Sequence, residues 1–338
     1  MQLADIINNF GIAASNIQPF GTGLINNTWL VGEENSPDYI LQRVNTNIFK
    51  SPEAIAYNTR LIANHLAKYH PDYFFISPLQ THSGQDVLKT ATGYYRMFPY
   101  VKDSHTIDVV QTPGQAFEAA KAFGKFTRLL ADLDYGRLKI TLPHFHNLSL
   151  RFQQFQTALK SGNKQRLMES GKLVDFIFDQ KNIVEEFEQI RNYNGFKLRV
   201  THHDTKISNV LFDKNDNCIC VIDLDTVMPG YFISDMGDMM RTYLSPVGEE
   251  ENDLSKIQAR REFFDAIVKG YSSEMAEELT ETEAQHFLYA GKFMIFMQAI
   301  RFLTDHLNND IYYGAKYEGQ NFVRAGNQVK LLEELLKI

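Results

Sequence analysis

The predominant spacing of apolar residues changes close to Tyr100 in this 338-residue chain, and the change limits the folds that the chain can adopt. Before it, residues 28–31 and 39–44 are rich in β-branched and aromatic side chains, and turn-forming residues separate them, so they predict a hairpin. After it, apolar residues recur at helical intervals through long segments. The sequence therefore predicts an α+β fold, strand-rich first and mainly helical afterwards.

Within the first part, residues 3–10 and 52–66 carry apolar residues at helical spacing and predict two helices. Ser51 is expected to cap the free amides of the second helix, because Pro52 suits the first helical position. Three short strands are expected in the stretches FFISPLQ, QDVLKT and YYRMF, between residues 73 and 98. Residues 1–99 are thus expected to form the first domain.

The remaining residues, 100–338, are expected to form a helical domain. One segment interrupts it, LRVTHHDTKISNVLFDKNDNCICVIDLDTVMPG, which predicts two short strands set around polar loops. A polar hairpin inserted among helices is where chemistry is expected. The expected helices lie at about 112–133, 147–161, 165–192, 253–271, 280–307 and 319–337.

Composition excludes several classes of protein. The formal net charge is −7, and no run of basic residues is present, which argues against nucleic acid as the main partner. No stretch approaches the roughly 18 apolar residues of a membrane span, and the N-terminus does not resemble a signal peptide, so a cytoplasmic protein without a membrane partner is expected. Cys218 and Cys220 are too few for a disulfide framework or a four-cysteine metal site.

Oxygen-bearing side chains gather in the interrupting segment. Asn209 follows Asp204 by five positions, Asp223 follows it by 19, and Asp225 comes two residues later. Oxygen ligands without sulfur suit Mg²⁺, which also binds substrate phosphates. Phosphoryl transfer to a hydroxyl needs a carboxylate that orients and deprotonates the hydroxyl, together with an Asn and an Asp that hold the metal. This order of residues therefore predicts a magnesium-dependent phosphotransferase site.

The same segment resembles a known superfamily. HHDTKISN followed by VIDLDT is similar to the catalytic and metal loops of the aminoglycoside phosphotransferase and choline kinase superfamily, which has the two-lobed protein-kinase-like fold. The stretches FGTGLINNTW, YILQRVN, DLDTVMPG and AIRFLTDHLNND resemble bacterial N-acetylhexosamine 1-kinases. The resemblance implies a nucleotide-binding lobe over residues 1–99. It also implies a helical lobe over residues 100–338 with the catalytic loop, the metal loop and the acceptor site.

The resemblance implies a role for each residue of the two loops. Asp204 would be the catalytic carboxylate, Asn209 and Asp223 would be metal ligands, and Asp225 would be a supporting acid in the same metal loop. ATP and Mg²⁺ are the implied cofactors. Asp and Asn residues in loops also make local turn hydrogen bonds, which is the alternative interpretation of each.

Neighbouring residues receive structural roles or none. His202 is expected to pack and to form hydrogen bonds rather than transfer a proton. His203 stands where aminoglycoside phosphotransferases commonly have glycine, and its role is open. Asp235 and Asp238 lie at the start of a predicted helix, where capping would explain them.

Five residues are candidates for nucleotide binding, namely Gly21, Gly23, Arg43, Met97 and Phe98. Gly21 and Gly23 open the first hairpin and either cover the ATP phosphates or are ordinary turn glycines. Met97 and Phe98 join the two parts and either contact adenine or belong to the core. The chain contains no G-x-x-x-x-G-K-[ST] motif, which excludes a P-loop.

The expected lysine of the third strand is missing. Arg43 stands in its place, and Asn58 lies on the next helix where a glutamate would be expected, with Glu53 nearer the start of that helix. Arg43 either binds phosphate through its guanidinium or is exposed at an edge strand. The substitution supports an alternative function, a nucleotide-binding pseudokinase scaffold, whereas the complete loop residues favour an active kinase.

Arg301 and Asp305 are the candidates for the acceptor site. They are one helical turn apart and either form an ion pair or, as the resemblance implies, contact the substrate. The expected acceptor is a small molecule, namely an amino sugar. It would be an N-acetylhexosamine that is phosphorylated on its anomeric hydroxyl. Choline, homoserine, methylthioribose and aminoglycoside kinases are the alternatives within the same class.

Overall fold

The computed structural model of the chain describes residues 2–13, 16–21, 25–33 and 36–338. These residues divide into two units, and neither unit is continuous in sequence. Over the described ranges, no helix combines the length and the apolar composition needed to cross a bilayer. The first unit is Met1–Thr106, Leu129–Pro143 and Val210–Pro229, and the second is Ile107–Arg128, His144–Asn209 and Gly230–Ile338.

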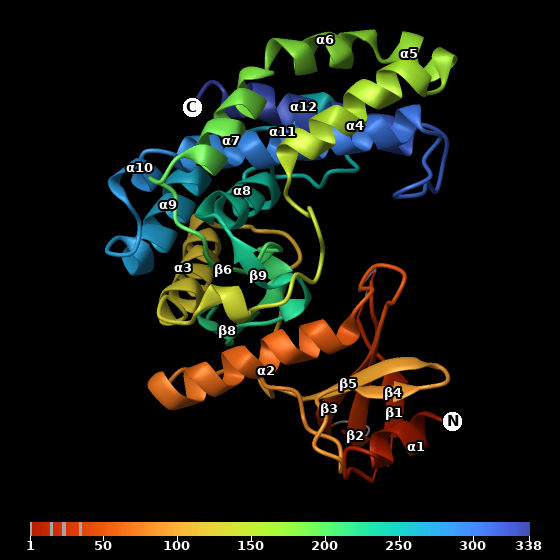
Figure 1. The fold of residues 1–338 in the computed structure, drawn as a ribbon, viewed down its shortest axis with the longest axis vertical. Helices are drawn as coiled ribbons and strands as arrows, with labels where there is room; N and C mark the ends of the chain where they lie inside the picture. The colour runs from red at the N-terminus through yellow and green to blue at the C-terminus, as the bar shows by residue number, and fades with distance from the viewer. Residues whose placement is uncertain (1, 14–15, 22–24, 34–35) are drawn as a thin grey trace. The chain divides into compact units, whose positions relative to one another are not determined.

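The first unit contains a five-stranded antiparallel sheet in the order β1-β2-β3-β5-β4 (Figure 1). The expected hairpin is confirmed as β2 and β3, in which Trp29 lies opposite Leu41. Leu41 in turn lies opposite Met97 on β5. The strands are β1 (Asn16–Pro19), β2 (Asn27–Glu33), β3 (Ser36–Val44), β4 (Leu88–Thr90) and β5 (Gly93–Pro99).

One face of this sheet packs on α1 (Leu3–Asn8), which confirms the first predicted helix. Successive side chains of a strand point to opposite faces, so Gln42, Arg96 and Phe98 lie on the other face, away from this core. The core face of the sheet thus carries Leu41 and Met97, and the opposite face carries Gln42, Arg96 and Phe98. The core residues are Ile6, Ile7, Phe10, Val31, Leu41, Tyr95 and Met97.

The second predicted helix is confirmed as α2 (Pro52–Tyr69), which begins at Pro52. The predicted cap is wrong, because the Ser51 side chain makes no capping hydrogen bond. The Ser51 carbonyl instead accepts the amide of Ala54 at 3.0 Å. Since Pro52 has no N–H, one of the free donors at this helix start is removed without a cap.

Two of the predicted strands are wrong or shortened. Residues 74–80 form no strand, because Pro78 cannot donate to a ladder, and only the amide of Leu79 bonds the sheet, at the Met97 carbonyl (2.7 Å). Of the stretch 85–90, only Leu88–Thr90 is a strand, β4. The short strand β1 lacks clear alternation and was not predicted.

The polar segment that interrupts the helical part of the sequence contains a hairpin, as predicted. Its strands are β7 (Val210–Phe212) and β8 (Cys218–Val221), and both belong to the first unit. Burial raises the pKa of the Cys220 thiol to about 12, so this cysteine is held as an unreactive thiol. The remaining short elements are η1 (Tyr135–Arg137), η3 (Leu224–Thr226) and β9 (Met228–Gly230).

The second unit is helical, and α11 (Phe287–Leu307) contacts α4, α7, α8 and α12 (Figure 1). Most α11 residues are buried, so this helix forms the core of the unit. The other elements are α3 (Pro113–Leu129), α4 (Leu148–Ser161), α5 (Lys164–Glu169), α6 (Gly171–Asp179), α7 (Asn182–Asn192), β6 (Arg199–Thr201), η2 (Ile207–Asn209), α8 (Phe232–Tyr243), η4 (Leu254–Lys256), α9 (Arg261–Met275), α10 (Glu281–Ala284) and α12 (Gln320–Leu335).

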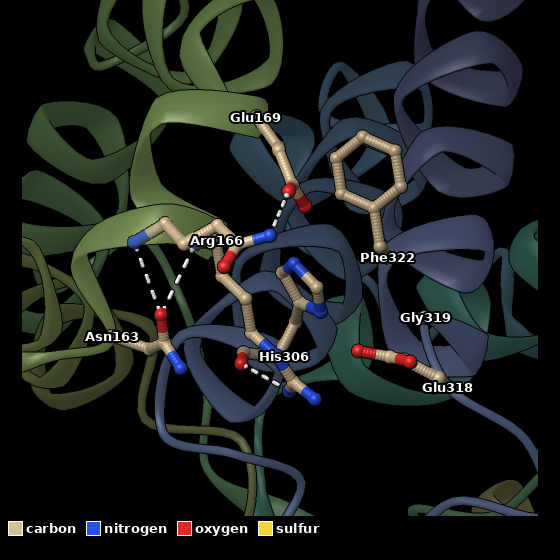
Figure 2. A pocket seen from close by; sticks show the side chains of 8 residues that line it. Asn163, Arg166, Glu169, His306, Glu318, Gly319 and Phe322 are labelled. Carbon is tan, nitrogen blue, oxygen red and sulfur yellow. Dashed lines mark hydrogen bonds between the residues drawn. The ribbon is translucent and has the colours of Figure 1, made fainter.

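Three predicted helices are interrupted. The segment 165–192 forms α5, α6 and α7, because Ser170 leaves helical geometry and its hydroxyl bonds the Arg166 carbonyl at 2.7 Å. The segment 253–271 becomes η4 and α9, and 280–307 becomes α10 and α11. A polar hollow with a volume of about 340 Å³ opens beside α5, α11 and α12 (Figure 2).

Candidate active site

The loop after β6 carries Asp204 and is held by a buried carboxylate of α8. Asp235 accepts the amides of His202 (3.1 Å) and His203 (2.7 Å). The capping role predicted for Asp235 is therefore wrong. Because α8 begins at Phe232, Asp235 is its fourth residue and lies beyond the free amides of the helix start. Its carboxylate satisfies loop amides that would otherwise be buried without partners.

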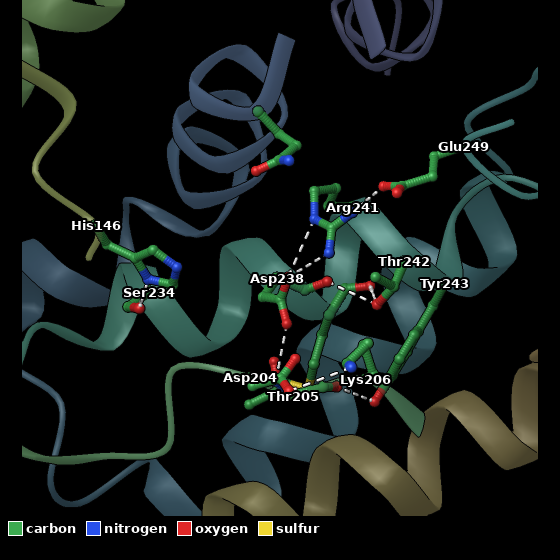
Figure 3. A network of polar contacts seen from close by, with 12 residues as sticks. His146, Asp204, Thr205, Lys206, Ser234, Asp238, Arg241, Thr242, Tyr243 and Glu249 are labelled. Carbon is green, nitrogen blue, oxygen red and sulfur yellow. Dashed lines mark hydrogen bonds and ion pairs between the residues drawn. The ribbon is translucent and has the colours of Figure 1, made fainter. Parts of the chain in front are cut away.

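Asp238 holds the same loop one helical turn further along α8, so its predicted capping role is also wrong. Its Oδ2 accepts the Thr205 amide at 2.8 Å (Figure 3). The Thr205 hydroxyl donates to the Asp235 carbonyl at 2.8 Å, and the Thr205 carbonyl accepts the Tyr243 hydroxyl at 2.6 Å. The buried helix α8 thus fixes the loop backbone both before and after Asp204 in the sequence.

Charges beneath the loop are balanced by arginines. Burial raises the pKa of Asp238, although Arg241 opposes the shift with an ion pair at 3.0 Å. Burial also raises the pKa of Asp235, to about 7, against the loop amides that lower it. Arg241 further pairs with Glu249 at 3.0 Å, and despite burial the arginines Arg241 and Arg324 lower the pKa of Glu249.

Asp204 itself is held at one of its two oxygens. Asn209 Nδ2 donates to the Asp204 carbonyl (2.8 Å) and to Asp204 Oδ2 (3.1 Å). Lys206 Nζ lies 3.2 Å from the same oxygen. The Asp204 side chain is 21% exposed, and Asn209 and Lys206 both contact its Oδ2. The carboxylate is oriented and still accessible, which is the arrangement that a general base requires.

His203 adopts the left-handed conformation with φ of 68°, which glycine adopts without strain and other residues adopt at a cost. The ring is anchored, since Nδ1 lies 2.7 Å from Ser234 Oγ, and Ser234 also bonds His146 Nδ1. The ring also packs so closely on Gly230 that a Cβ there would lie 2.4 Å from Cε1. These contacts stabilise a histidine where a glycine would fit more easily. His202 packs edge-on against Phe123 with ring centroids 5.1 Å apart, as its predicted structural role requires.

Asn209 and Asp223 offer oxygen donors of the kind that Mg²⁺ prefers. The Asn209 amide nitrogen donates to Asp204, and the side-chain carbonyl oxygen is the Asn209 atom that could serve as a metal ligand. Asp223 follows β8 with φ of 62°, a strained conformation for a residue other than glycine. The chemistry of both residues fits a hard cation.

Asp225 has other partners. It is 2% exposed, pairs with Arg96, and accepts Asn26 Nδ2 at 2.9 Å on its second oxygen. Arg96 also donates to Gln42 at 3.0 Å and lies over the Phe98 ring at 5.2 Å. Both Asp225 oxygens accept hydrogen bonds from protein side chains, so its contacts favour a positioning role in the loop after β8.

Arg43 lies on the opposite face of β3 from Gln42 and is exposed, close to Gly93. Asn58 is fully buried on α2, donating to the carbonyls of Lys139 (2.8 Å) and Val227 (3.0 Å). Asn58 therefore binds backbone groups where a glutamate would form an ion pair. The buried cation on this sheet is Arg96.

The nucleotide candidates differ in their surroundings. Met97 is buried in the core against α1, whereas Phe98 is partly exposed on the other face of β5. Gly21 is exposed with φ of 77°, which requires glycine or a strained residue. Gly23 lies outside the described residues.

Arg301 and Asp305 separate into two environments. Arg301 donates to Gln298 at 3.1 Å, and its guanidinium lies 5.4 Å from the Tyr313 ring centroid and 5.9 Å from that of Tyr312. Asp305 is buried and accepts the amides of Tyr312 (2.7 Å) and Tyr313 (2.9 Å). Asp305 thus fixes the aromatic segment that surrounds Arg301.

The surroundings of Arg301 are electropositive. Burial and Arg301 both lower the pKa of Arg151. Burial, His203 and Arg301 hold the pKa of His146 well below its usual value. The Phe145 ring stacks on His146 with centroids 4.3 Å apart and lies 5.9 Å from the Arg301 guanidinium. This region therefore favours neutral or anionic groups over cations.

The sequence analysis did not predict the contributions of Lys206, Ser234 and Arg96 to the site, nor the supporting role of Asp235. Lys206 stands inside the recognised motif and could have been selected there. Ser234, Arg96 and Asp235 act on partners about 30 or more residues away, and no local pattern marks such pairs.

The chain matches the sequence profile of a family described as the phosphotransferase enzyme family, APH, over residues 16–277. Among solved structures, a spectinomycin phosphotransferase in complex with ADP and spectinomycin is 14% identical with a TM-score of 0.64, over 100% of this chain and 98% of that chain.

Two further structures have a similar fold. A microcompartment-associated aminopropanol kinase is 16% identical with a TM-score of 0.63, over 99% of this chain and 97% of that one. A choline kinase from Cryptosporidium parvum is 12% identical with a TM-score of 0.57, over 95% and 90% of the two chains. At these identities the similarity concerns the fold, and it confirms the predicted kinase-like α+β fold.

Proposed function

The chain belongs to the phosphotransferase enzyme family, and from this premise we propose that it transfers the γ-phosphoryl group of ATP to a hydroxyl of a small molecule. The observation that carries the proposal is the oriented, accessible Asp204 carboxylate, held by Asn209 and Lys206 on a loop that Asp235 fixes. Similar structures in complex with ADP or AMP support a nucleotide as the donor.

In this reaction Asp204 accepts the proton of the acceptor hydroxyl, and the hydroxyl oxygen forms a bond to the γ-phosphorus. The bond between that phosphorus and the β–γ bridging oxygen breaks, and ADP leaves with the electron pair. Lys206, 3.2 Å from Asp204, places a positive charge beside the transferred group.

Asn209 and Asp223 are the proposed Mg²⁺ ligands, and Mg²⁺ when bound would offset the charge on the phosphates. Asp223→Ala should therefore weaken the binding of ATP in the presence of Mg²⁺ and reduce turnover to background. Titration calorimetry of ATP with and without Mg²⁺ measures this directly. An unchanged Mg²⁺ dependence in the variant would remove Asp223 from the site, and Asp216→Asn, an exposed aspartate on the β7–β8 hairpin, serves as the control.

For the acceptor we propose an N-acetylhexosamine that is phosphorylated on its anomeric hydroxyl, giving a sugar 1-phosphate. The resemblance of the Arg301 segment to hexosamine kinases supports this, and so does the electropositive, aromatic environment of Arg301. Arginine binds neutral hydroxyl and acetamide oxygens, and aromatic rings cover apolar sugar faces. Cationic acceptors such as choline or aminoglycosides would be repelled by the same guanidinium groups.

A screen of acceptors tests both levels of the proposal. The purified protein is incubated with ATP, Mg²⁺ and one acceptor from a set of N-acetylglucosamine, N-acetylgalactosamine, choline, aminopropanol and spectinomycin. Phosphorus NMR then identifies the phosphorylated position. A sugar 1-phosphate is expected, and product from a cationic acceptor alone would overturn the sugar assignment but keep the kinase. Absence of ATP consumption with every acceptor would favour the pseudokinase alternative.

A further inference from the structure

A chain of polar contacts runs through the second unit from the loop of Asp204 to the surroundings of Arg301, and Glu249 lies at its centre. Figure 3 shows the half of this chain that leads to Asp204. Glu249 follows α8 in the sequence, and its two oxygens bind different arginines. Its Oε2 accepts Arg241 Nη1 at 3.0 Å, and its Oε1 accepts Arg324 Nη2. Glu249 therefore bridges α8, which carries Arg241, and α12, which carries Arg324.

The first half of the chain of contacts reaches the loop that carries Asp204. Arg241 Nε and Nη2 donate to Asp238 Oδ1 at 3.1 and 3.0 Å. The other oxygen of Asp238 accepts the amide of Thr205, the residue directly after Asp204, at 2.8 Å. Because Arg241 has a second carboxylate partner in Asp238, this half keeps an ion pair when the charge of Glu249 is removed.

The second half leads to Tyr312 and Tyr313, here called the aromatic segment, whose rings border the proposed acceptor site. The Arg324 guanidinium lies 5.2 Å from the Tyr313 ring centroid, and Nη1 donates to Asn321 Oδ1 at 3.2 Å. Asn321 Nδ2 in turn donates to Asp305 Oδ2 at 3.1 Å. Asp305 accepts the amides of Tyr312 and Tyr313. The position of Arg324 is therefore linked to that of the aromatic segment.

Glu249 is the carboxylate on which Arg324 depends. Within the part of the chain that the structure describes, Arg324 forms an ion pair with Glu249 alone, whereas Arg241 also pairs with Asp238. Both arginine side chains are only 15% exposed, so water screens their charges poorly. Without the charge of Glu249, the two guanidinium groups would repel each other, and Arg324 would be left as a largely buried cation without a counter-ion.

We propose that Glu249 is a positioning residue for the acceptor, which holds the aromatic segment through Arg324 and the loop of Asp204 through Arg241. The inference rests on the proposed function, because it assumes that the acceptor binds beside the aromatic segment and gives its proton to Asp204. Glu249 acts through the two arginines and not on the reacting atoms. One carboxylate thereby fixes the proposed base and the acceptor surroundings relative to each other, which the alignment of reacting groups requires.

Steady-state kinetics of Glu249→Gln tests this role, with N-acetylglucosamine or the acceptor that the screen selects in its place. The variant keeps the size of the side chain and removes its charge. The acceptor KM should rise roughly 5- to 30-fold, since a hydrogen bond to a charged group contributes a factor near 10. The value of kcat and the KM for ATP should stay within about 3-fold, because Asp238 still holds Arg241. Glu185→Gln, which breaks an exposed ion pair with Lys181 on α7, is the matched control and should keep the parent values.

Hydrogen–deuterium exchange of the full chain, followed by mass spectrometry, separates this inference from the proposed function. The amides of Tyr312 and Tyr313 should exchange about 5-fold faster or more in Glu249→Gln, while peptides of α4 exchange at the parent rate. If the parent protein phosphorylates no acceptor, the proposed function fails and the kinetic role of Glu249 fails with it. The exchange rates would still decide whether Glu249 holds the aromatic segment.

Arg324→Gln tests the same link from α12 and replaces Glu249→Gln if that variant does not fold. It should raise the acceptor KM by a similar factor, and the double variant should exceed either single variant by no more than about 2-fold. Fully additive effects would overturn the inference. So would exchange of the aromatic segment at the rate of the Glu185→Gln control, faster exchange of all peptides alike, or an unchanged acceptor KM in a variant whose aromatic segment exchanges faster.

Discussion

Among single residues, Asp204 is the one on which the proposed reaction depends most directly. Asp204→Asn keeps the size of the side chain but removes the proton acceptor, so turnover should fall by about 10²- to 10⁴-fold. The dissociation constant of ATP should change little, because other residues are proposed to bind ATP. Steady-state kinetics and nucleotide titration measure the two quantities separately.

The control for this prediction is Asp265→Asn, which changes an exposed aspartate on α9 paired with Arg261. It should leave both turnover and ATP affinity at the parent values. The role of Asp204 as base would be rejected if its own variant kept turnover within a few-fold of the parent.

Asp235 gives a pH-dependent prediction. Its folded pKa is raised to about 7, so the stabilisation that it provides is complete below its unfolded pKa, near 4, and is lost as pH rises through 7. Asp235→Asn cannot titrate. Between pH 5 and pH 8, the parent should therefore lose up to roughly 3 kcal/mol of unfolding free energy relative to the variant. Urea unfolding of both proteins at the two pH values measures this difference, and an equal difference at both would exclude titration of Asp235 in this range.

At the scale of secondary-structure elements, the end of β9 and the loop that carries Asp204 are in close contact at Gly230. A Cβ on Gly230 would lie 2.4 Å from Cε1 and 2.7 Å from Nε2 of His203. The ring cannot move away without losing its bond to Ser234. Gly230→Ala should therefore lower the unfolding free energy by about 1 to 3 kcal/mol and reduce turnover.

Two variants distinguish this clash from a general effect of alanine. Gly326→Ala adds a Cβ on α12 where no atom lies within 4 Å, and it should be neutral or stabilising by up to about 1 kcal/mol. His203→Ala combined with Gly230→Ala removes the ring, so the two losses should be less than additive. Strict additivity of the two losses would contradict the proposed contact.

The elements also separate what sequence could predict from what it could not. The proposed catalytic loop could be predicted because Asp204 and Asn209 belong to one short motif whose spacing is local. The role of Asp235 was missed, because the same residue at a helix start suits a cap, and only the three-dimensional structure brings it to amides 32 and 33 residues earlier. The break at Ser170 was missed for a related reason, since apolar periodicity continues across a local hydrogen bond that ends the helix.

For the whole molecule, the predicted order of a strand-rich part and a helical part agrees with the structure, because hydrophobic periodicity averages over long segments. Hydrophobic periodicity could not predict which residues belong to each of the two units. Residues 129–143 and 210–229 belong to the first unit although they lie inside the helical half of the sequence. These segments join the first unit through contacts between residues far apart in the sequence, and such contacts produce no periodic pattern of apolar residues.

The proposed acceptor specificity of the molecule can be tested by substituting Arg301. Arg301→Ala should reduce kcat/KM for an N-acetylhexosamine by about 10- to 150-fold, equivalent to roughly 1.5 to 3 kcal/mol for hydrogen bonds to a charged group. The KM for ATP should stay at the parent value. Arg301→Lys keeps the charge but loses the planar pair of donors, so it should restore only part of the activity. Full activity of the lysine variant would mean that charge alone acts there, whereas unchanged acceptor kinetics of the alanine variant would limit Arg301 to its contacts with Gln298 and the tyrosine rings.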